Sequence, residues 1–433
     1  MTTQVERSDP DADSLGGWYL QPRPVFSGGN QVTLLRGGDA LFPAMCEAID
    51  SARHEVWLAT YIFHHDAAVV PSVVATLVAA ARRGVAVSVV VDGFGGAESW
   101  PLIERTLNDG GVRTAVFRPM RRWWNWLQPG QLRRLHQKLC AVDAEVAFVG
   151  GINLIDDRLD LRHGVSEQPR LDYAVRVRGP MAQAVHQTAR AIWTRASLGR
   201  AFGGEMAALA RSAQPVARAR ELLGRLRTQD PSLAPANAAD LAPVRAAFVV
   251  RDNFRQRRSI ERSYVEAIRK AHTSIDLVSP YFYPGRTFRR ALREAARRGV
   301  RVRLLLQGQW DYRMAALAAY ALYDEMLGRG MLIHEYTAAF LHAKVAVIDD
   351  DWATVGSSNI DPMSLLLNLE ANVIVRDRDF AAGLRQEFET ALAGAKAVTR
   401  SEGGSGTMAL LRRGFVAWCA RLYLRVAGAT GRY

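Results

Sequence analysis

The stretch HQKLCAVDAEVAFVGGIN at residues 136–153 returns with the same spacing as HAKVAVIDDDWATVGSSN at residues 342–359. Five residue types recur at identical intervals in the two copies: His136, Lys138, Asp143, Gly150 and Asn153 in the first, and His342, Lys344, Asp349, Gly356 and Asn359 in the second. Only four of the 56 basic residues are lysines, and two of those four hold the same motif position. A compact ammonium is therefore required there rather than a planar guanidinium. The repeat predicts two equivalent halves.

Around each copy, the hydrophobic pattern predicts alternating helices and strands. Helical periodicity covers 69–83 and 286–298, and each helix leads through a glycine into a short apolar strand, 85–91 or 300–306. Each motif itself is predicted to be a β-hairpin with its acidic residue at the turn. Alternation of this kind argues for the α/β class, with sheets covered by helices on both faces.

Shifts in composition divide the chain into five segments. We expect a disordered lead over 1–28, a first half over 29–198, and a linker or helical excursion over 199–243. A second half follows over 244–400, and a basic amphipathic tail over 401–433. The first thirty residues carry no apolar segment typical of a signal peptide, and no apolar run reaches the roughly 18 residues of a spanning helix.

Neither half alone holds two histidines of the motif, but together the halves supply two imidazoles, two ammonium groups and two carboxamides. This set suits displacement at a phosphodiester: one neutral histidine attacks phosphorus, and the other, protonated, donates to the leaving oxygen. We expect Lys138, Lys344, Asn153 and Asn359 to bind the non-bridging oxygens and stabilise the transition state. The reaction needs no metal or other cofactor, and we expect none.

Carboxylates in the strands that follow the motifs are candidates for orienting the histidines. Asp172 and Glu370 each begin an apolar strand, and a carboxylate on the far ring nitrogen would improve a histidine nucleophile. Simple polarity at a strand end explains these two residues equally well. Asp143 and Asp349 belong to the motif and are counted with the catalytic set, although their place at the turns favours a role in fixing the hairpins.

The charge and the aromatic residues favour an acidic partner at a surface. Net charge is +13 and the pI is about 10.1, which fits an anionic membrane or nucleic acid. Trp123, Trp124 and Trp126 lie between two arginine pairs, Arg121-Arg122 and Arg133-Arg134, on the loop before His136. That loop could sit at the headgroup boundary, stack on nucleotides, or cap the core. In the tail, arginines lie opposite an apolar stripe, as in an interfacial helix or one docked on its own domain.

The paired motif resembles that of the phospholipase D superfamily, and the chain is more closely similar to bacterial cardiolipin synthases of the type without an N-terminal membrane anchor. The most specific stretches are WATVGSSNIDPMS at 352–364 and LNLEANV at 367–373. The resemblance implies two similar halves, each a mixed sheet flanked by helices, packed with pseudo-two-fold symmetry around one shared site. It implies nucleophile and acid/base roles for His136 and His342, with His136 favoured as the nucleophile. Ser357 is counted among the supporting residues. The first motif has Gly151 at the corresponding position and therefore offers no hydroxyl for the same role.

From this likeness we expect a phosphatidyltransferase that joins two phosphatidylglycerol molecules into cardiolipin, releases glycerol, and passes through a phosphohistidine. The expected location is peripheral, on the cytoplasmic face of a bacterial membrane, held by the tryptophan loop and the tail. The alternative is a phospholipase D-type phosphodiesterase or a nuclease acting on another diester. We do not expect nucleic acid as the substrate, because nucleases of the superfamily tend to be short single-motif dimers. A third alternative is a non-catalytic protein that binds membranes or nucleic acid. It would require two intact catalytic motifs to persist without a function.

Overall fold

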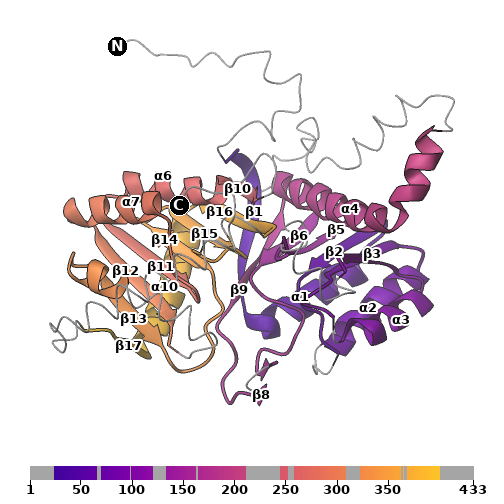
Figure 1. Ribbon diagram of the computed structural model, residues 1–433, viewed down its shortest axis with the longest axis horizontal. Helices are drawn as coiled ribbons and strands as arrows, with labels where there is room; N and C mark the ends of the chain where they lie inside the picture. Colours follow the sequence, from indigo (N-terminus) through magenta and orange to yellow (C-terminus); the bar gives the residue numbers. More distant parts are fainter. Residues whose placement is uncertain are drawn as a thin grey trace, which may run out of the picture.

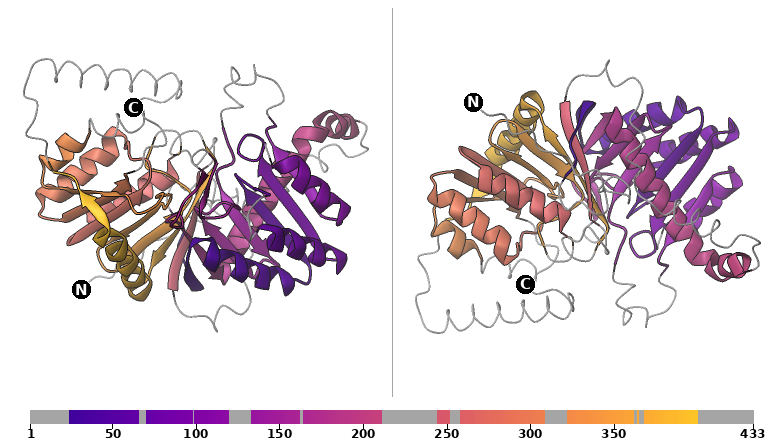
Figure 2. Two further views of the ribbon diagram at one scale, coloured as in Figure 1. Left: turned by 90° about the horizontal axis from the view of Figure 1, so that it is seen from below. Right: turned by 90° about the horizontal axis from the view of Figure 1, so that it is seen from above.

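The computed structural model describes residues 24–65, 70–97, 99–119, 133–161, 164–210, 244–251, 258–308, 322–361, 364 and 368–399. Within them, the chain forms two α/β halves whose strands join in a single 15-stranded sheet. Figure 1 shows the first half in indigo to magenta and the second in salmon to yellow. The views in Figure 2 show the two halves packed side by side, with their strands meeting at the centre of the molecule. The predicted α/β class and the two similar halves are confirmed.

Seven strands of each half correspond in their order along the chain. Those of the first half are β1 (Ser27–Arg36), β2 (Glu55–Thr60), β3 (Ala86–Asp92), β4 (Arg113–Phe117), β5 (Lys138–Val142), β6 (Val146–Gly150) and β9 (Tyr173–Arg178). Those of the second half are β10 (Val244–Arg251), β11 (Ser274–Ser279), β12 (Arg301–Gln307), β13 (Leu332–Tyr336), β14 (Val345–Ile348), β15 (Trp352–Gly356) and β16 (Glu370–Arg376). The remaining strands are a small hairpin, β7 (Leu159–Asp160) with β8 (Gly164–Val165), and an edge strand, β17 (Ala395–Ala397).

The strand order makes the pseudo-two-fold symmetry explicit. From the centre outward, the first half runs β1-β9-β6-β5-β2-β3-β4 and the second runs β10-β16-β15-β14-β11-β12-β13, with β17 added at its edge. The axis passes between β1 and β10, which pair antiparallel. In each half the outer three strands are parallel and the others antiparallel, which makes the sheet mixed. Parallel neighbours need a crossover connection, and helices supply it.

Helices cover both faces of the sheet. One face of the first half is covered by α1 (Gly37–Asp50), α2 (Val70–Arg82) and α3 (Trp100–Asp109). The same face of the second half is covered by α6 (Ser259–Lys270) and α7 (Arg286–Arg297). On the other face, α4 (Pro180–Ala210) and α10 (Arg378–Ala393) enclose a core shared by the two halves. Burial on both faces explains why β3 and β12 each have an apolar central run, 89–91 in β3 and 304–306 in β12.

Some expected boundaries differ from the observed elements. Helix α4 runs to Ala210, twelve residues beyond the position where we ended the first half, and β1 begins at Ser27 inside the segment assigned to the lead. Strand β10 begins at Val244. The tryptophan loop before His136, most of the 199–243 segment and the whole 401–433 tail lie outside the described residues. Among the helices that are described, none combines the length and apolar character needed to cross a membrane.

Candidate active site

Each motif folds as a β-hairpin whose turn is fixed by its aspartate. Asp143 and Asp349 lie in the left-handed region, with φ of 50° and 48°. The Asp143 carboxylate accepts backbone N–H groups from residues 53–55 at 2.7–2.9 Å. Asp349 does the same with residues 272–274 at 2.8–3.1 Å. Burial would raise the pKa of Asp349, but these hydrogen bonds outweigh it and lower the pKa.

The two aspartates follow the far ends of β5 and β14, whereas the histidines and lysines lie at the beginnings of those strands. Their carboxylates are therefore held away from the histidines by the length of a strand. This geometry favours a role for Asp143 and Asp349 in fixing the hairpin turns, and their inclusion in the catalytic set stays a prediction.

Backbone hydrogen bonds cross between the halves just before each histidine. The His136 N–H donates to the carbonyl of Leu369 at 3.0 Å, and the Leu369 N–H donates to the carbonyl of Arg134 at 2.8 Å. The symmetry-related contacts join His342 and Phe340 to Leu171, each at 2.9 Å. Since Leu369 and Leu171 immediately precede Glu370 and Asp172, each half delivers its carboxylate to the histidine of the other half.

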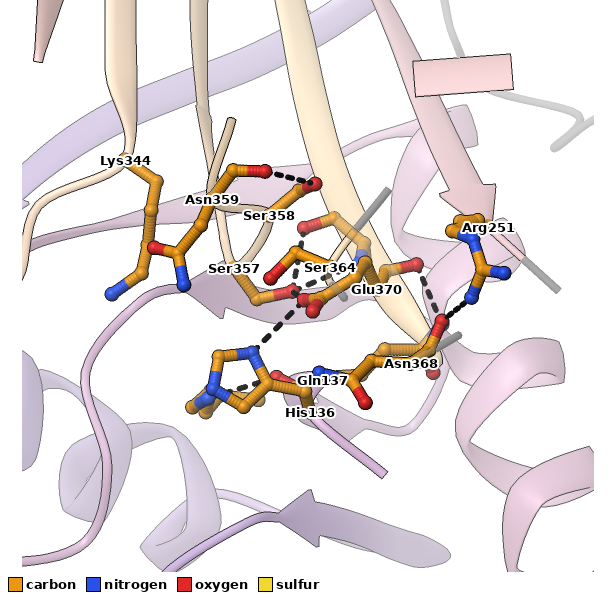
Figure 3. Close-up of polar contacts among 12 residues, drawn as sticks. His136, Gln137, Arg251, Lys344, Ser357, Ser358, Asn359, Ser364, Asn368 and Glu370 are labelled. Carbon is orange, nitrogen blue, oxygen red and sulfur yellow. Dashed lines mark hydrogen bonds and ion pairs between the residues drawn. The ribbon is translucent and has the colours of Figure 1, made fainter. Parts of the chain in front are cut away.

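The crossed pairs are short and buried. Nδ1 of His136 lies 3.0 Å from Oε2 of Glu370, and Nδ1 of His342 lies 2.6 Å from Oδ2 of Asp172. Both carboxylates are buried, and each histidine side chain is at most one quarter exposed. Figure 3 shows the His136 ring facing Glu370, whose Oε2 also accepts the Ser357 hydroxyl at 2.6 Å. With Nδ1 engaged, Nε2 is the nitrogen left for chemistry in each ring.

The surroundings lower the basicity of both rings. Burial lowers the pKa of His136, while Glu370 partly restores it. Burial, the ammonium of Lys344 and the guanidinium of Arg170 hold the pKa of His342 well below its usual range. Burial would raise the pKa of Glu370, but contact with His136 and Ser357 keeps it lowered, whereas burial raises the pKa of Asp172 to about 6. The two half-sites are thus electrostatically unequal.

A difference between the motifs has a steric cause. At Gly151 an added Cβ would lie 2.3 Å from Oδ1 of Asp172, so no side chain fits there while that carboxylate faces His342. In the second half, Ser357 occupies the corresponding position because Glu370 is one methylene longer, and the serine hydroxyl binds the carboxylate instead. Gly151 with Asp172 and Ser357 with Glu370 are therefore two size-matched pairs.

The lysines and asparagines complete the site. Nζ of Lys138 donates to the carbonyl of His136 at 2.8 Å, and Lys344 makes the same contact with His342. Burial lowers the pKa of Lys138 to about 8 and that of Lys344 to about 7. Figure 3 shows Lys344 and Asn359 pointing from the second half toward the His136 ring. Oδ1 of Asn359 is buried with no partner among the residues that the structure describes. Oδ1 of Asn153 accepts the N–H of Ile62 at 3.3 Å.

Three contributors were not singled out from the sequence. Tyr61 packs edge-on against His136, with ring centroids 5.1 Å apart, and its ring centroid lies 5.4 Å from Nζ of Lys138. Asp92, at the end of β3, accepts the N–H of Leu135 at 2.8 Å; Gln307, at the end of β12, accepts the N–H of Leu341 at 3.0 Å. A signal existed, because tyrosines recur where the strands β2 and β11 end and polar residues recur where β3 and β12 end.

The arrangement resembles known proteins. A family model described as "Cardiolipin synthase, PLD-like domain" matches residues 45–166 and 264–392. Cardiolipin synthase B of Escherichia coli is 35% identical over 84% of this chain and 81% of its own length. Cardiolipin synthase A of Pseudomonas putida is 30% identical over 84% of this chain and 69% of its own length. The crystal structure of phosphatidylserine synthase from Haemophilus influenzae superposes with a TM-score of 0.61 at 11% identity, over 91% of this chain and 94% of that chain. This structural likeness concerns the fold alone.

Proposed function

The chain belongs to the family of cardiolipin synthases with phospholipase D-like domains, and on this premise we propose that it makes cardiolipin from two molecules of phosphatidylglycerol. It is a phosphatidyltransferase with a phospholipid substrate. The observation that carries the proposal is the crossed pairing of each histidine with a buried carboxylate of the other half. Two imidazoles oriented in this way serve one phosphorus atom and not two separate sites.

In the first step, Nε2 of His136 attacks the phosphorus of the donor lipid. Its Nδ1–H remains bound to Glu370, which stabilises the positive charge that the ring acquires as the P–N bond forms. His342 donates a proton to the glycerol oxygen as the P–O bond breaks, and glycerol leaves. The donor is then a phosphatidyl group on His136, and His342 is neutral.

In the second step, the neutral His342 takes the proton from a primary hydroxyl of the acceptor lipid. The hydroxyl oxygen forms a bond to phosphorus while the P–N bond to His136 breaks, which releases cardiolipin and restores both rings. One phosphodiester replaces another, so no nucleotide is consumed.

The two ammonium groups and two carboxamides bind the non-bridging oxygens in this proposal. Burial of Lys138 and Lys344 disfavours their charged forms, as their lowered pKa values indicate, so an anionic phosphate compensates the cost of keeping them protonated. The unpartnered Oδ1 of Asn359 belongs to a side chain that points into this region, where its amide group can donate to an oxygen of the phosphate.

We further propose a peripheral location on the cytoplasmic face of a bacterial membrane. The net charge of +13 supports attraction to anionic lipid. Trp123, Trp124 and Trp126 and the amphipathic 401–433 tail would supply interfacial contacts. In the same scheme, the halves at 29–198 and 244–400 are the two catalytic units, and the intervening 199–243 is a connection.

The test uses the purified full chain with phosphatidylglycerol vesicles and product identification by mass spectrometry. We expect cardiolipin and glycerol in equal amounts from wild type, and loss of both products in the His136→Ala and His342→Ala variants. Phosphatidic acid as the sole lipid product would assign the chain to the hydrolases instead. Full activity in either histidine variant would contradict the shared site.

A further inference from the structure

The approach to the first histidine is positively charged, and the equivalent approach to the second is not. Between β3 and the first motif, residues 93–135 contain seven basic and three acidic residues, whereas the corresponding residues 308–341, between β12 and the second motif, contain two basic and four acidic residues. The basic residues of the first segment are Arg105, Arg113, Arg118, Arg121, Arg122, Arg133 and Arg134, and the last six follow its acidic residues without interruption. Because the two halves otherwise correspond strand for strand, this difference is not a requirement of the fold.

One of these arginines is neutralised within the protein. Nε of Arg134 lies 3.0 Å and 3.1 Å from the two carboxylate oxygens of Asp92, and its NH2 group donates to the carbonyl of Arg118 at 2.9 Å. Asp92 is buried and also accepts the N–H groups of Phe94 and Leu135. The negative charge of Asp92 is therefore compensated by Arg134, and its hydrogen bonds to backbone N–H groups fix the chain next to His136.

Arg118 and Arg133 lie beside this pair without a carboxylate of their own. Arg118 is half-buried, and its guanidinium donates to the carbonyl of Arg133 at 3.3 Å. Within the described part of the chain, no carboxylate contacts either side chain at ion-pair distance. Burial and then the charges of Arg133 and Arg134 lower the pKa of Arg118 to about 10. Cations that repel one another in a partly desolvated place are stabilised when an anion joins them.

The position of the cluster identifies the anion. Arg133 precedes His136 by three residues, so their Cα atoms are no more than about 10 Å apart. The acceptor lipid carries a phosphodiester of its own, six bonds from the reacting phosphorus once its hydroxyl is in line. Bond lengths of about 1.5 Å keep those two phosphorus atoms within about 8 Å of each other. A free glycerol molecule or water used as acceptor has no such phosphate.

We propose that Arg118 and Arg133 bind the phosphate of the acceptor lipid and so select a phospholipid over a small alcohol as acceptor. The inference rests on the proposed function and deepens it. Guanidinium groups suit a phosphodiester because they donate in a planar fork and stay charged on partial burial. The same chemistry would also attract headgroups of the surrounding bilayer, so an experiment must separate the acceptor in the site from the bulk lipid.

A partition experiment makes that separation. The full chain is given phosphatidylglycerol in nonionic detergent micelles together with labelled glycerol, and both products, cardiolipin and labelled phosphatidylglycerol, are measured. Both come from one phosphatidyl-enzyme intermediate, so their ratio reports the choice of acceptor and is independent of the amount of folded protein. The variants are Arg118→Gln and Arg133→Gln, with Arg118→Lys as the conservative replacement. Arg290→Gln is the control, since Arg290 is 70% exposed on α7.

We expect the ratio of cardiolipin to labelled phosphatidylglycerol to fall at least about tenfold in each glutamine variant, the effect of losing a charged hydrogen bond. The lysine variant should recover part of the ratio, and Arg290→Gln should match wild type. An unchanged ratio in both glutamine variants would overturn the proposal. An unchanged ratio with reduced sedimentation on phosphatidylglycerol vesicles would assign the arginines to bulk headgroups instead. Absence of both products from wild type would refute the proposed function itself.

Discussion

Replacing Gly151 with serine would give the first motif the Gly-Ser sequence of the second, yet it should slow the reaction. A Cβ at this position lies 2.3 Å from Oδ1 of Asp172, so the carboxylate must withdraw by about 1 Å to reach the 3.4 Å of an ordinary contact. Asp172 holds Nδ1 of His342 at only 2.6 Å. Losing a hydrogen bond to a charged group costs about 1.5–3 kcal/mol, which predicts a rate lower by a factor of about 10–150.

The assay is cardiolipin formation per folded enzyme, with thermal unfolding followed in parallel. A second variant sharpens the test: adding Asp172→Glu to Gly151→Ser rebuilds the size-matched pair of the other half-site and should recover part of the lost rate. The Gly151→Ser variant should therefore form cardiolipin more slowly than the double variant, so the effects of the two substitutions are not additive. A Gly151→Ser enzyme with wild-type turnover would refute the steric reasoning.

Three further predictions concern the carboxylates and the histidines. Glu370→Gln should lower kcat by about 10-fold to about 150-fold without unfolding the protein, because a neutral amide stabilises the His136 cation less; undiminished single-turnover rates would argue against this positioning role. The pKa of His342 is lowered by burial and by neighbouring cations, and a bound phosphodiester offsets those cations. Since the group must be protonated to donate, activity falls as pH rises through its pKa, and the alkaline limb of kcat should lie at higher pH than that of kcat/KM; coincident limbs would contradict this. Asp349→Ala should lower the free energy of unfolding in urea by about 1–3 kcal/mol, with turnover per folded molecule nearly unchanged; a stable but inactive variant would keep Asp349 in the catalytic set.

The repeated motif predicted much of the fold because its signals are local. The strands of both hairpins and the apolar strands β3 and β12 follow from short-range periodicity, and the equivalence of the halves follows from the equal spacing. The sequence did not specify which carboxylate serves which histidine. Glu370 follows His342 by 28 residues, but it contacts His136, since the halves exchange these residues through packing that no local pattern records.

Other features depended on atomic distances. Nothing in the sequence indicated that Gly151 is small because Asp172 fills the space beside it. Tyr61 was not singled out from the sequence, although its ring packs against His136. The turn position of Asp349 favoured a structural role, and its hydrogen bonds to backbone amides support that prediction. Side chains that act through backbone atoms or neighbouring rings leave little trace in residue spacing.

The central claim is that both histidines act on one phosphorus atom, and the number of covalent phosphatidyl groups per chain tests it most directly. Enzyme mixed with labelled phosphatidylglycerol, quenched under alkaline conditions and digested, should carry at most one label per chain, located on the peptide with His136. The His136→Ala variant should carry none. Two labels per chain, one on each histidine, would mean that the halves work as separate sites and would contradict the account.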